Sequence, residues 1–272
     1  MQFYKTLEDI LQTSKPHDKI EKFNKFYKQY KLNNISHDNS HKPVVFKEPS
    51  FTKHCKIVPA QQVPRRRKLT TNEDKAILIH AITHIEYSAI DLALDAAYRF
   101  KNLPKKFYDD WLEVADDEIR HFLLLESMLK ELDYNYGDFN VHAFLFDTSM
   151  ATLNLVDRMA CVPRYLEASG LDANPQIITK VKKLNSPFSD NLIKTLTIIL
   201  DEEIDHVKKG DYWFKYACNK ENIDSANFYK IVEKYLPGAS KKKAFVNIEF
   251  RKLAGYSCDE IKVISDSECE DN

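Results

Sequence analysis

Apolar residues recur at helical spacing through most of the 272-residue chain. Positions three and four apart form apolar stripes, which predict four long helices at about 71–100, 106–132, 148–168 and 189–219. Thr71 and the acids that follow it provide an N-cap and an acidic first turn for the first helix. Pro163 predicts a kink within the third helix, and Gly170 predicts its end.

Shorter segments flank these helices. Residues 4–31 predict one or two short helices interrupted near Pro16, and the four prolines within 33–69 predict a long irregular arm. Further short helices are expected at 175–184, 226–235 and 245–253, and the acidic end is expected to be disordered. The predicted division is an N-terminal segment and arm (1–69), a helical bundle (70–220), C-terminal helices packed on it (221–264) and a tail (265–272).

Composition favours a mainly α-helical globular protein. Only 5 residues are glycine, and 43% are hydrophobic, enough for a sizeable core. The formal net charge of −1 argues against a surface built as a whole to bind nucleic acid. There is no Gly-x-Gly-x-x-Gly run and no Walker-type loop.

The cysteines and the N-terminus indicate a soluble cytoplasmic protein. Five scattered cysteines without a Cys-x-x-Cys pair predict neither a disulfide framework nor a zinc cage. The first residues are amphipathic without an apolar signal core, and no stretch reaches the roughly 20 apolar residues of a membrane span. We therefore expect no membrane partner.

Two copies of Glu-x-x-His are the most informative motif. Glu118 and His121 lie in the second predicted long helix, and Glu203 and His206 lie in the fourth. Residues three apart share one face of a helix, so each carboxylate and imidazole can reach the same ion. Both pairs fall on apolar stripes, where an unpaired carboxylate would be costly to bury. Two ordinary buried or surface ion pairs are the alternative interpretation.

Two further glutamates complete a candidate metal set. Glu86 lies on the apolar stripe of the first long helix, and Glu167 lies near the end of the third, where an ion pair with Arg164 is the alternative. Each helix with a lone glutamate precedes a helix with Glu-x-x-His, as in ferritin-like bundles. Four carboxylates and two imidazoles suit two iron ions, with manganese or a mixed iron and manganese pair as alternatives.

Several neighbouring residues have weaker assignments. His84 and His80 are predicted to be structural or to support the ligands, and His142 either approaches the site or caps a helix. Tyr87 and Tyr165 are packing residues or redox groups. Asp117 and Asp205 could accept hydrogen bonds from ligand imidazoles. The basic run Arg65-Arg66-Arg67-Lys68 is read as a solvated charge cluster in preference to a contact for nucleic acid or an anionic substrate.

Five runs resemble the bacterial ferritin-like family catalogued as domain of unknown function 455. They are His-Ala-Ile-Thr-His-Ile-Glu-Tyr-Ser-Ala-Ile-Asp-Leu-Ala-Leu-Asp-Ala (80–96), Phe-Tyr-Asp-Asp-Trp (107–111), Asp-Glu-Ile-Arg-His-Phe (117–122), Val-Pro-Arg-Tyr-Leu-Glu-Ala-Ser-Gly-Leu-Asp (162–172) and Asp-Glu-Glu-Ile-Asp-His-Val (201–207). The similarity covers about 60–256. It implies an all-α fold, a ferritin-like four-helix bundle with a metal site in its core, whose reaction is not assigned.

Three functions follow from these expectations. The first is an oxygen-activating oxidoreductase resembling hydroxylases, with oxygen or peroxide and an unidentified substrate as partners. The second is iron handling or peroxide scavenging, and the third is a non-catalytic scaffold tied together by metal. A nucleic-acid partner is not favoured, and the oligomeric state is left open.

Overall fold

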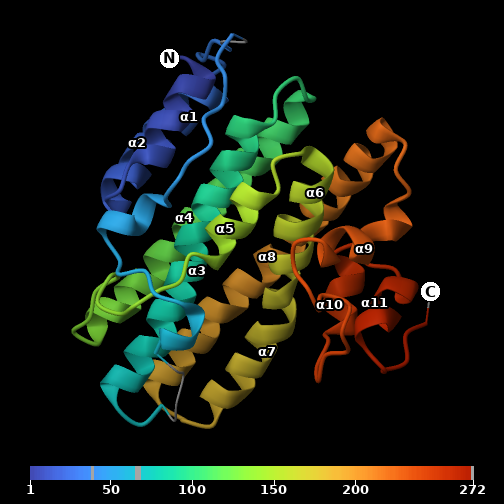
Figure 1. Ribbon diagram of the computed structural model, residues 1–272. Coiled ribbons are helices and arrows are strands. Elements are labelled where there is room, and N and C mark those ends of the chain that lie inside the picture. Colours follow the sequence, from blue (N-terminus) through green and yellow to red (C-terminus); the bar gives the residue numbers. More distant parts are fainter. Residues whose placement is uncertain (38–39, 65–68, 271–272) are drawn as a thin grey trace. The chain divides into compact units, whose positions relative to one another are not determined.

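The computed structural model describes residues 1–37, 40–64 and 69–270, and these are predominantly helical (Figure 1). Among them there is no β-strand, only two isolated bridges, Gln2 with Ser36 and Ile57 with Val141. The predicted all-α class is confirmed. The chain forms two compact units, Met1–Phe146 and Asp147–Asn272. The boundaries predicted at 69, 220 and 264 separate an arm, a bundle, C-terminal helices and a tail. They describe a different kind of division from these two units and remain a prediction.

A helical hairpin forms the core of the first unit. Helices α3 (Asn72–Arg99) and α4 (Lys105–Glu131) pack side by side and are joined by the short link 100–104. Thr71 and Asp74 form a capping box at the start of α3, which satisfies backbone donors that the helix cannot pair itself. Both helices lie close to their predicted ranges.

Two N-terminal helices and the long arm cover this hairpin. Helix α1 (Phe3–Gln12) packs against α2 (Pro16–Lys31) and α3. The helical stretch is broken between Gln12 and Pro16, which confirms the predicted interruption, and Pro16 occupies the first turn of α2, where its missing N–H costs nothing. The arm contains two short 3₁₀ turns, η1 (Ser50–Lys53) and η2 (Ala60–Gln62).

The arm is fixed to α3 by buried polar and aromatic contacts. Phe51 meets the His84 ring edge to face at 4.7 Å between centroids. The fully buried Lys19 ammonium donates to Ser50 Oγ at 2.7 Å and pairs with Asp91 of α3. Because Ser50 also donates to Asp91 at 2.5 Å, the three groups satisfy one another inside the unit.

The second unit is built along α8 (Pro187–Glu221). This helix starts with a capping box at Ser186, with Pro187 in the first turn, and ends where Asn222 adopts a left-handed conformation with φ of 55°. Packed along α8 are α6 (Leu155–Met159), the π-helix η3 (Ala160–Leu166) and α7 (Ala168–Lys182). Helix α5 (Phe144–Ala151) precedes them.

The prediction of one helix over 148–168 is wrong. The chain is non-helical at 152–154 and then passes from α6 through η3 into α7, which continues past Gly170 and includes the separate helix predicted at 175–184. Pro163 lies within η3, whose wider turn accommodates a residue that has no N–H and whose ring would clash in an α-helix.

Short C-terminal helices complete the second unit, and they contact or contain its two fully buried arginines, Arg164 and Arg251. These helices are η4 (Ser225–Asn227), α9 (Phe228–Glu233), α10 (Ile248–Leu253) and α11 (Cys258–Ile264). Helix α11 was not predicted. Cys258 forms a disulfide bond with Cys269, a pairing the sequence analysis did not anticipate. Residues 271 and 272 of the predicted disordered tail lie outside the described ranges.

Among the described helices, α3 alone is long and apolar enough to cross a membrane. However, 78% of its apolar window is buried within the fold. A helix that passes through the centre of a soluble domain has the same composition. Most of the apolar surface of α3 is therefore covered by other parts of the fold.

Candidate metal centre

Three predicted ligands meet inside the hairpin of the first unit. Glu86 projects from α3, while Glu118 and His121 project from α4 one turn apart. His121 Nδ1 lies 3.2 Å from Glu86 Oε2 and 3.3 Å from Glu118 Oε2. One ligand atom from each residue lies within 4.8 Å of the others. The three side chains are between 0% and 6% exposed, so this is a buried cluster that could hold a metal ion.

The charges of this cluster depend on one another. Burial alone would lower the pKa of His121, but hydrogen bonds and attraction from Glu118 and Glu86 outweigh it and raise the pKa to about 11. Without a metal, the imidazole is therefore protonated and holds both carboxylates by ion pairs. The positive charge on His121 balances part of the carboxylate charge, and a metal ion bound by the same three groups could replace it.

Three aromatic rings pack together beside the helices that carry the cluster. Tyr87 and Phe122, each adjacent in sequence to a candidate ligand, lie 5.3 Å apart between ring centroids, and both are fully buried. Tyr136 contacts each of them at 5.3 Å. Tyr136 follows α4 in the turn region, and sequence reasoning missed it because no spacing rule relates a loop tyrosine to a helix face.

The neighbouring histidines have hydrogen-bond partners of their own. His84 Nε2 lies 3.0 Å from the carbonyl of His142, which can only accept, so this nitrogen carries the proton. The other nitrogen, Nδ1, then accepts from the Tyr136 hydroxyl at 2.9 Å. Burial lowers the pKa of His84 to about 4, which keeps the ring neutral. These bonds agree with the predicted structural role of His84.

His80 and His142 also hold the loop that follows α4. His80 Nε2 accepts from the Gly137 N–H at 2.9 Å, and burial lowers the pKa of His80 to about 4. His142 contributes its carbonyl to His84, and its Nδ1 accepts from the Phe144 N–H at 3.4 Å. Both histidines therefore fix the loop that follows α4.

The second Glu-x-x-His pair lies on α8 of the second unit. Glu203 and His206 are 5% and 2% exposed, and His206 Nδ1 lies 3.8 Å from Glu203 Oε1. The predicted burial of both side chains is confirmed. This separation is longer than the His121 contacts, so the two halves of the sequence motif differ in geometry.

Glu167 lies at the junction between η3 and α7 and is partly exposed. Its predicted alternative, an ion pair with Arg164, is wrong. Arg164 is fully buried, and its Nε and Nη2 donate to Asp211 and Glu260, both at 2.7 Å. Arg164 pairs with distant residues in place of Glu167 because it lies in the π-helix and its partners come from other helices. Local sequence spacing shows neither feature.

The remaining sequence candidates lie on the surface or in packing positions. Asp117 pairs with Arg120 at 2.5 Å. Asp205 is exposed and pairs with Lys209 at 2.6 Å, so it does not take the predicted role beside an imidazole. Tyr165 donates to the Ala239 carbonyl at 3.3 Å. The basic run Arg65 to Lys68 lies outside the described residues.

Comparison with known proteins gives a family relationship. Residues 12–262 match the model of a family described as "Protein of unknown function (DUF455)". An uncharacterized protein from Haemophilus influenzae is 35% identical over 287 aligned residues, which cover 98% of this chain and 95% of that protein. No solved structure matches. This chain therefore belongs to the family of proteins of unknown function designated DUF455.

Proposed function

We propose that this protein is a ferritin-like dinuclear metal protein and an oxygen-activating oxidoreductase of the hydroxylase type. The observation that carries the proposal is the convergence of two buried carboxylates, Glu86 and Glu118, on the buried imidazole of His121. Helices α3 and α4 supply these groups from facing positions, as a bundle requires. These three residues would hold the first ion.

Charge favours a divalent ion over a simple ion-pair cluster. With His121 protonated, two carboxylates and one imidazolium leave a net charge of −1 in a buried place. A divalent ion bound by the same carboxylates and a neutral imidazole would leave no net charge. Because a divalent ion balances two buried carboxylates more fully than a single proton does, the charges of these three residues support the metal-bound form.

The second unit repeats the same donors in the same chain order. We propose that Glu167, Glu203 and His206 supply the remaining ligands, which gives four carboxylates and two imidazoles for two ions. Glu203 and His206 are buried on one face of α8, as ligands must be. A site rich in hard oxygen donors, with one nitrogen for each ion, suits iron(II), or manganese(II) as an alternative.

When bound, two iron(II) ions would supply the electrons that dioxygen or peroxide takes up. The chain contributes ligands that are themselves shielded from water, because Glu86, Glu118 and His121 are 4%, 1% and 0% exposed. Excluding water protects reactive oxygen species from side reactions and strengthens the electrostatic effect of the carboxylates. The partners would then be dioxygen or peroxide and an organic substrate, and the cytoplasm remains the predicted compartment.

The test is the metal content of the intact chain, purified without added metal and again after iron(II) loading. Glu118→Gln keeps the shape of the side chain but removes its charge, and we expect it to lose the bound metal. Glu126→Gln is the matched control, because Glu126 lies on the same helix and is 8% exposed but pairs with His17 and Lys130.

The outcomes separate the candidate functions. Two ions per chain, together with dioxygen consumption on iron(II) addition that Glu118→Gln abolishes and Glu126→Gln retains, would support the oxidoreductase. Bound metal without any oxygen uptake would indicate a scaffold. Equal metal content in all three proteins would refute the site.

A further inference from the structure

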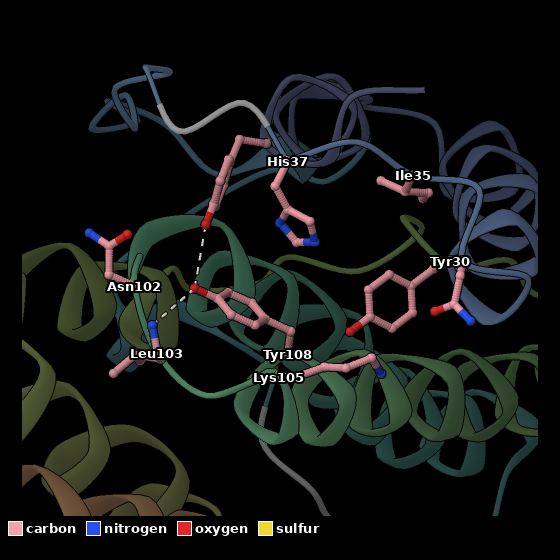
Figure 2. A pocket seen from close by; sticks show the side chains of 9 residues that line it. Tyr30, Ile35, His37, Asn102, Leu103, Lys105 and Tyr108 are labelled. Atoms are coloured by element: carbon pink, nitrogen blue, oxygen red, sulfur yellow. Dashed lines mark hydrogen bonds between the residues drawn. The ribbon is translucent and has the colours of Figure 1, made fainter.

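Two clefts in the described parts of the chain, one in each unit, differ in whether their charged groups are already paired. In the first unit, Tyr30, Lys105 and Tyr108 line one cleft (Figure 2). Lys105 pairs with Asp109 at 2.5 Å, and Tyr30 donates to the same carboxylate at 2.8 Å. The Tyr108 hydroxyl accepts from the Leu103 N–H at 3.4 Å. The protein itself therefore satisfies the lysine and the hydroxyls of this cleft.

The cleft of the second unit has a volume of about 460 Å³ and four charged residues in its lining. Clefts that take small molecules usually measure about 300–1,000 Å³. The four residues are two acids, Asp157 and Glu221, and two bases, Lys230 and Lys234. Within the described ranges, no ion pair joins any of these four side chains to another residue. Two charges of each sign are therefore available to a ligand.

The two lysines lie on one face of a helix. Lys230 belongs to α9, and Lys234 is its C-cap, with helical backbone angles φ of −63° and ψ of −32°. Residues four apart in a helix are neighbours one turn from each other, and two like charges at this spacing repel each other. A carboxylate bound between the two ammonium groups would relieve this repulsion, because each of its oxygens can accept from one lysine.

The two acids come from other elements. Glu221 is the last residue of α8, where the helix dipole disfavours a negative charge. Asp157 lies in α6, and its Oδ2 accepts from the Tyr235 hydroxyl and from the Asn154 amide, both at 2.5 Å. These donors are neutral, so they fix the carboxylate without balancing its charge. A cationic group of a ligand would balance the charge at both acids.

Three aliphatic side chains complete the lining. Val156 and Ile231 are 2% and 5% exposed, so the fold holds them in place. Ile223 is 36% exposed, and a hydrocarbon chain in the cleft would remove part of its apolar surface from water. The cleft therefore combines an apolar surface with separate groups for an anion and for a cation.

We propose that this cleft binds a small aliphatic zwitterion, an amino acid with its carboxylate at the two lysines and its ammonium at the two acids. The hydrocarbon part lies against the aliphatic side chains. A simple anion would be repelled by Asp157 and Glu221, and a simple cation by the lysines, so a ligand with one charge of each sign fits best. The cleft contains none of the proposed metal ligands, and the inference does not depend on the proposed function.

The test is a saturation-transfer NMR titration of the full chain with two probes, L-leucine and 6-aminohexanoate, whose charges lie at different separations. Hexanoate and pentylamine carry a similar hydrocarbon chain with one charge only, and glycine carries both charges without the chain. We expect at least one probe to bind, and the three comparison compounds to bind at least about fivefold more weakly. The tighter probe reports how far apart the lysines and the acids hold the two charges.

Variants then assign the binding to the cleft. Lys230→Gln and Lys234→Gln each remove one ammonium, and Glu221→Gln removes one carboxylate; each should weaken binding of the tighter probe by about fivefold or more. All three side chains are exposed, so the helices should be retained. The lysine and glutamate variants change the net charge in opposite directions, so long-range attraction cannot explain a loss that they share.

Lys220→Gln is the matched control, because Lys220 is exposed beside Glu221 on α8 and does not line the cleft. Four results would overturn the proposal. They are no binding of either probe, hexanoate or pentylamine binding as tightly as the better probe, unchanged binding in Lys230→Gln or Glu221→Gln, or an equal loss of binding in Lys220→Gln. Circular dichroism of each variant checks that the helices are retained.

Discussion

The hairpin of the first unit and the helix pair of the second carry the same arrangement of glutamates and histidine on different backbones. In the first, α3 and α4 are uninterrupted, and two carboxylates approach one imidazole to 3.2 and 3.3 Å. In the second, a π-helix containing Pro163 precedes Glu167, and Glu203 lies 3.8 Å from His206. Because Glu203 and His206 lie on α8, a helix as continuous as α4, the shared sequence motif fixes which donors are available but not how closely they meet.

The largest expected effect tests whether both helix pairs serve one metal centre. Glu203→Gln in the second unit should reduce bound iron as Glu118→Gln does in the first, because removal of either carboxylate leaves excess positive charge in a buried site. Metal analysis after iron(II) loading measures this. Glu202→Gln is the neighbouring control, and full metal content in Glu203→Gln would leave the centre to the first unit alone.

Substituting Arg164 tests which interactions hold η3 and α7 in place in the second unit. Its guanidinium is buried between Asp211 and Glu260 and lies over the Phe228 ring at 3.9 Å. Arg164→Met leaves both carboxylates without their buried cation, so we expect unfolding to become easier by about 3–5 kcal/mol. Urea denaturation measures this.

Lys215→Met provides the comparison for Arg164. Lys215 pairs with the same Asp211 at 2.7 Å, but its side chain is 46% exposed. Its loss should cost less than about 1 kcal/mol, as for other surface pairs. Equal effects of the two substitutions would contradict the role given to the buried arginine.

Substitutions at two glycines, Gly210 and Gly170, test how tightly η3 packs on α8. A Cβ atom at Gly210 would lie 2.8 Å from Pro163 Cβ and 2.9 Å from its carbonyl carbon, whereas one at Gly170 would meet nothing within 4 Å. Gly210→Ala should therefore destabilise the protein by about 3 kcal/mol, since backbone atoms must move apart. Gly170→Ala should be neutral or should stabilise by up to about 1 kcal/mol, because alanine favours helices. Thermal unfolding of both variants decides the point.

A more moderate effect than that of Arg164→Met concerns the disulfide bond between Cys258 and Cys269. Closing a chain of this length, with a sequence separation of 11, stabilises the folded state by about 2 kcal/mol through the entropy of the unfolded chain. Cys269→Ser should lower stability by that amount. Cys218→Ser, at a buried free thiol, should not remove a cross-link.

Thiol counting of the wild-type protein tests the compartment. A reducing cytoplasm would keep Cys258 and Cys269 as thiols. Protein alkylated at the moment of cell lysis should show three free cysteines if the bond exists in the cell and five if it does not, out of the five in the chain.

Sequence reasoning succeeded where local signals agree with tertiary packing. The capping box at Thr71 and the continuous apolar stripe placed α3 within one residue at each end, and Glu86, Glu118 and His121 were correctly expected to be buried. These features depend on residues a few positions apart.

It failed where distant residues decide the backbone. Gly170 was expected to end a helix, yet α7 runs through it because nothing at that position requires a left-handed backbone. The partners of Arg164 are 47 and 96 residues away in the chain, and Tyr136 is 52 residues from His84. No local pattern contains such pairings.

The π-helix also makes the chain sensitive to changes in length. An α-helix turns by about 100° for each residue, so a residue inserted or deleted next to η3, where the wide turns do not absorb the change, would rotate everything before or after it by that angle. Leu171 and Val181, both fully buried on α7, would then leave the side of α8, or Met159 and Ala160 would. The backbone atoms of Pro163 and Arg164 lie directly against Gly210 of α8. Replacing the side chain at 163 would therefore not make room for a rotated helix. This segment should therefore tolerate substitutions far better than insertions or deletions.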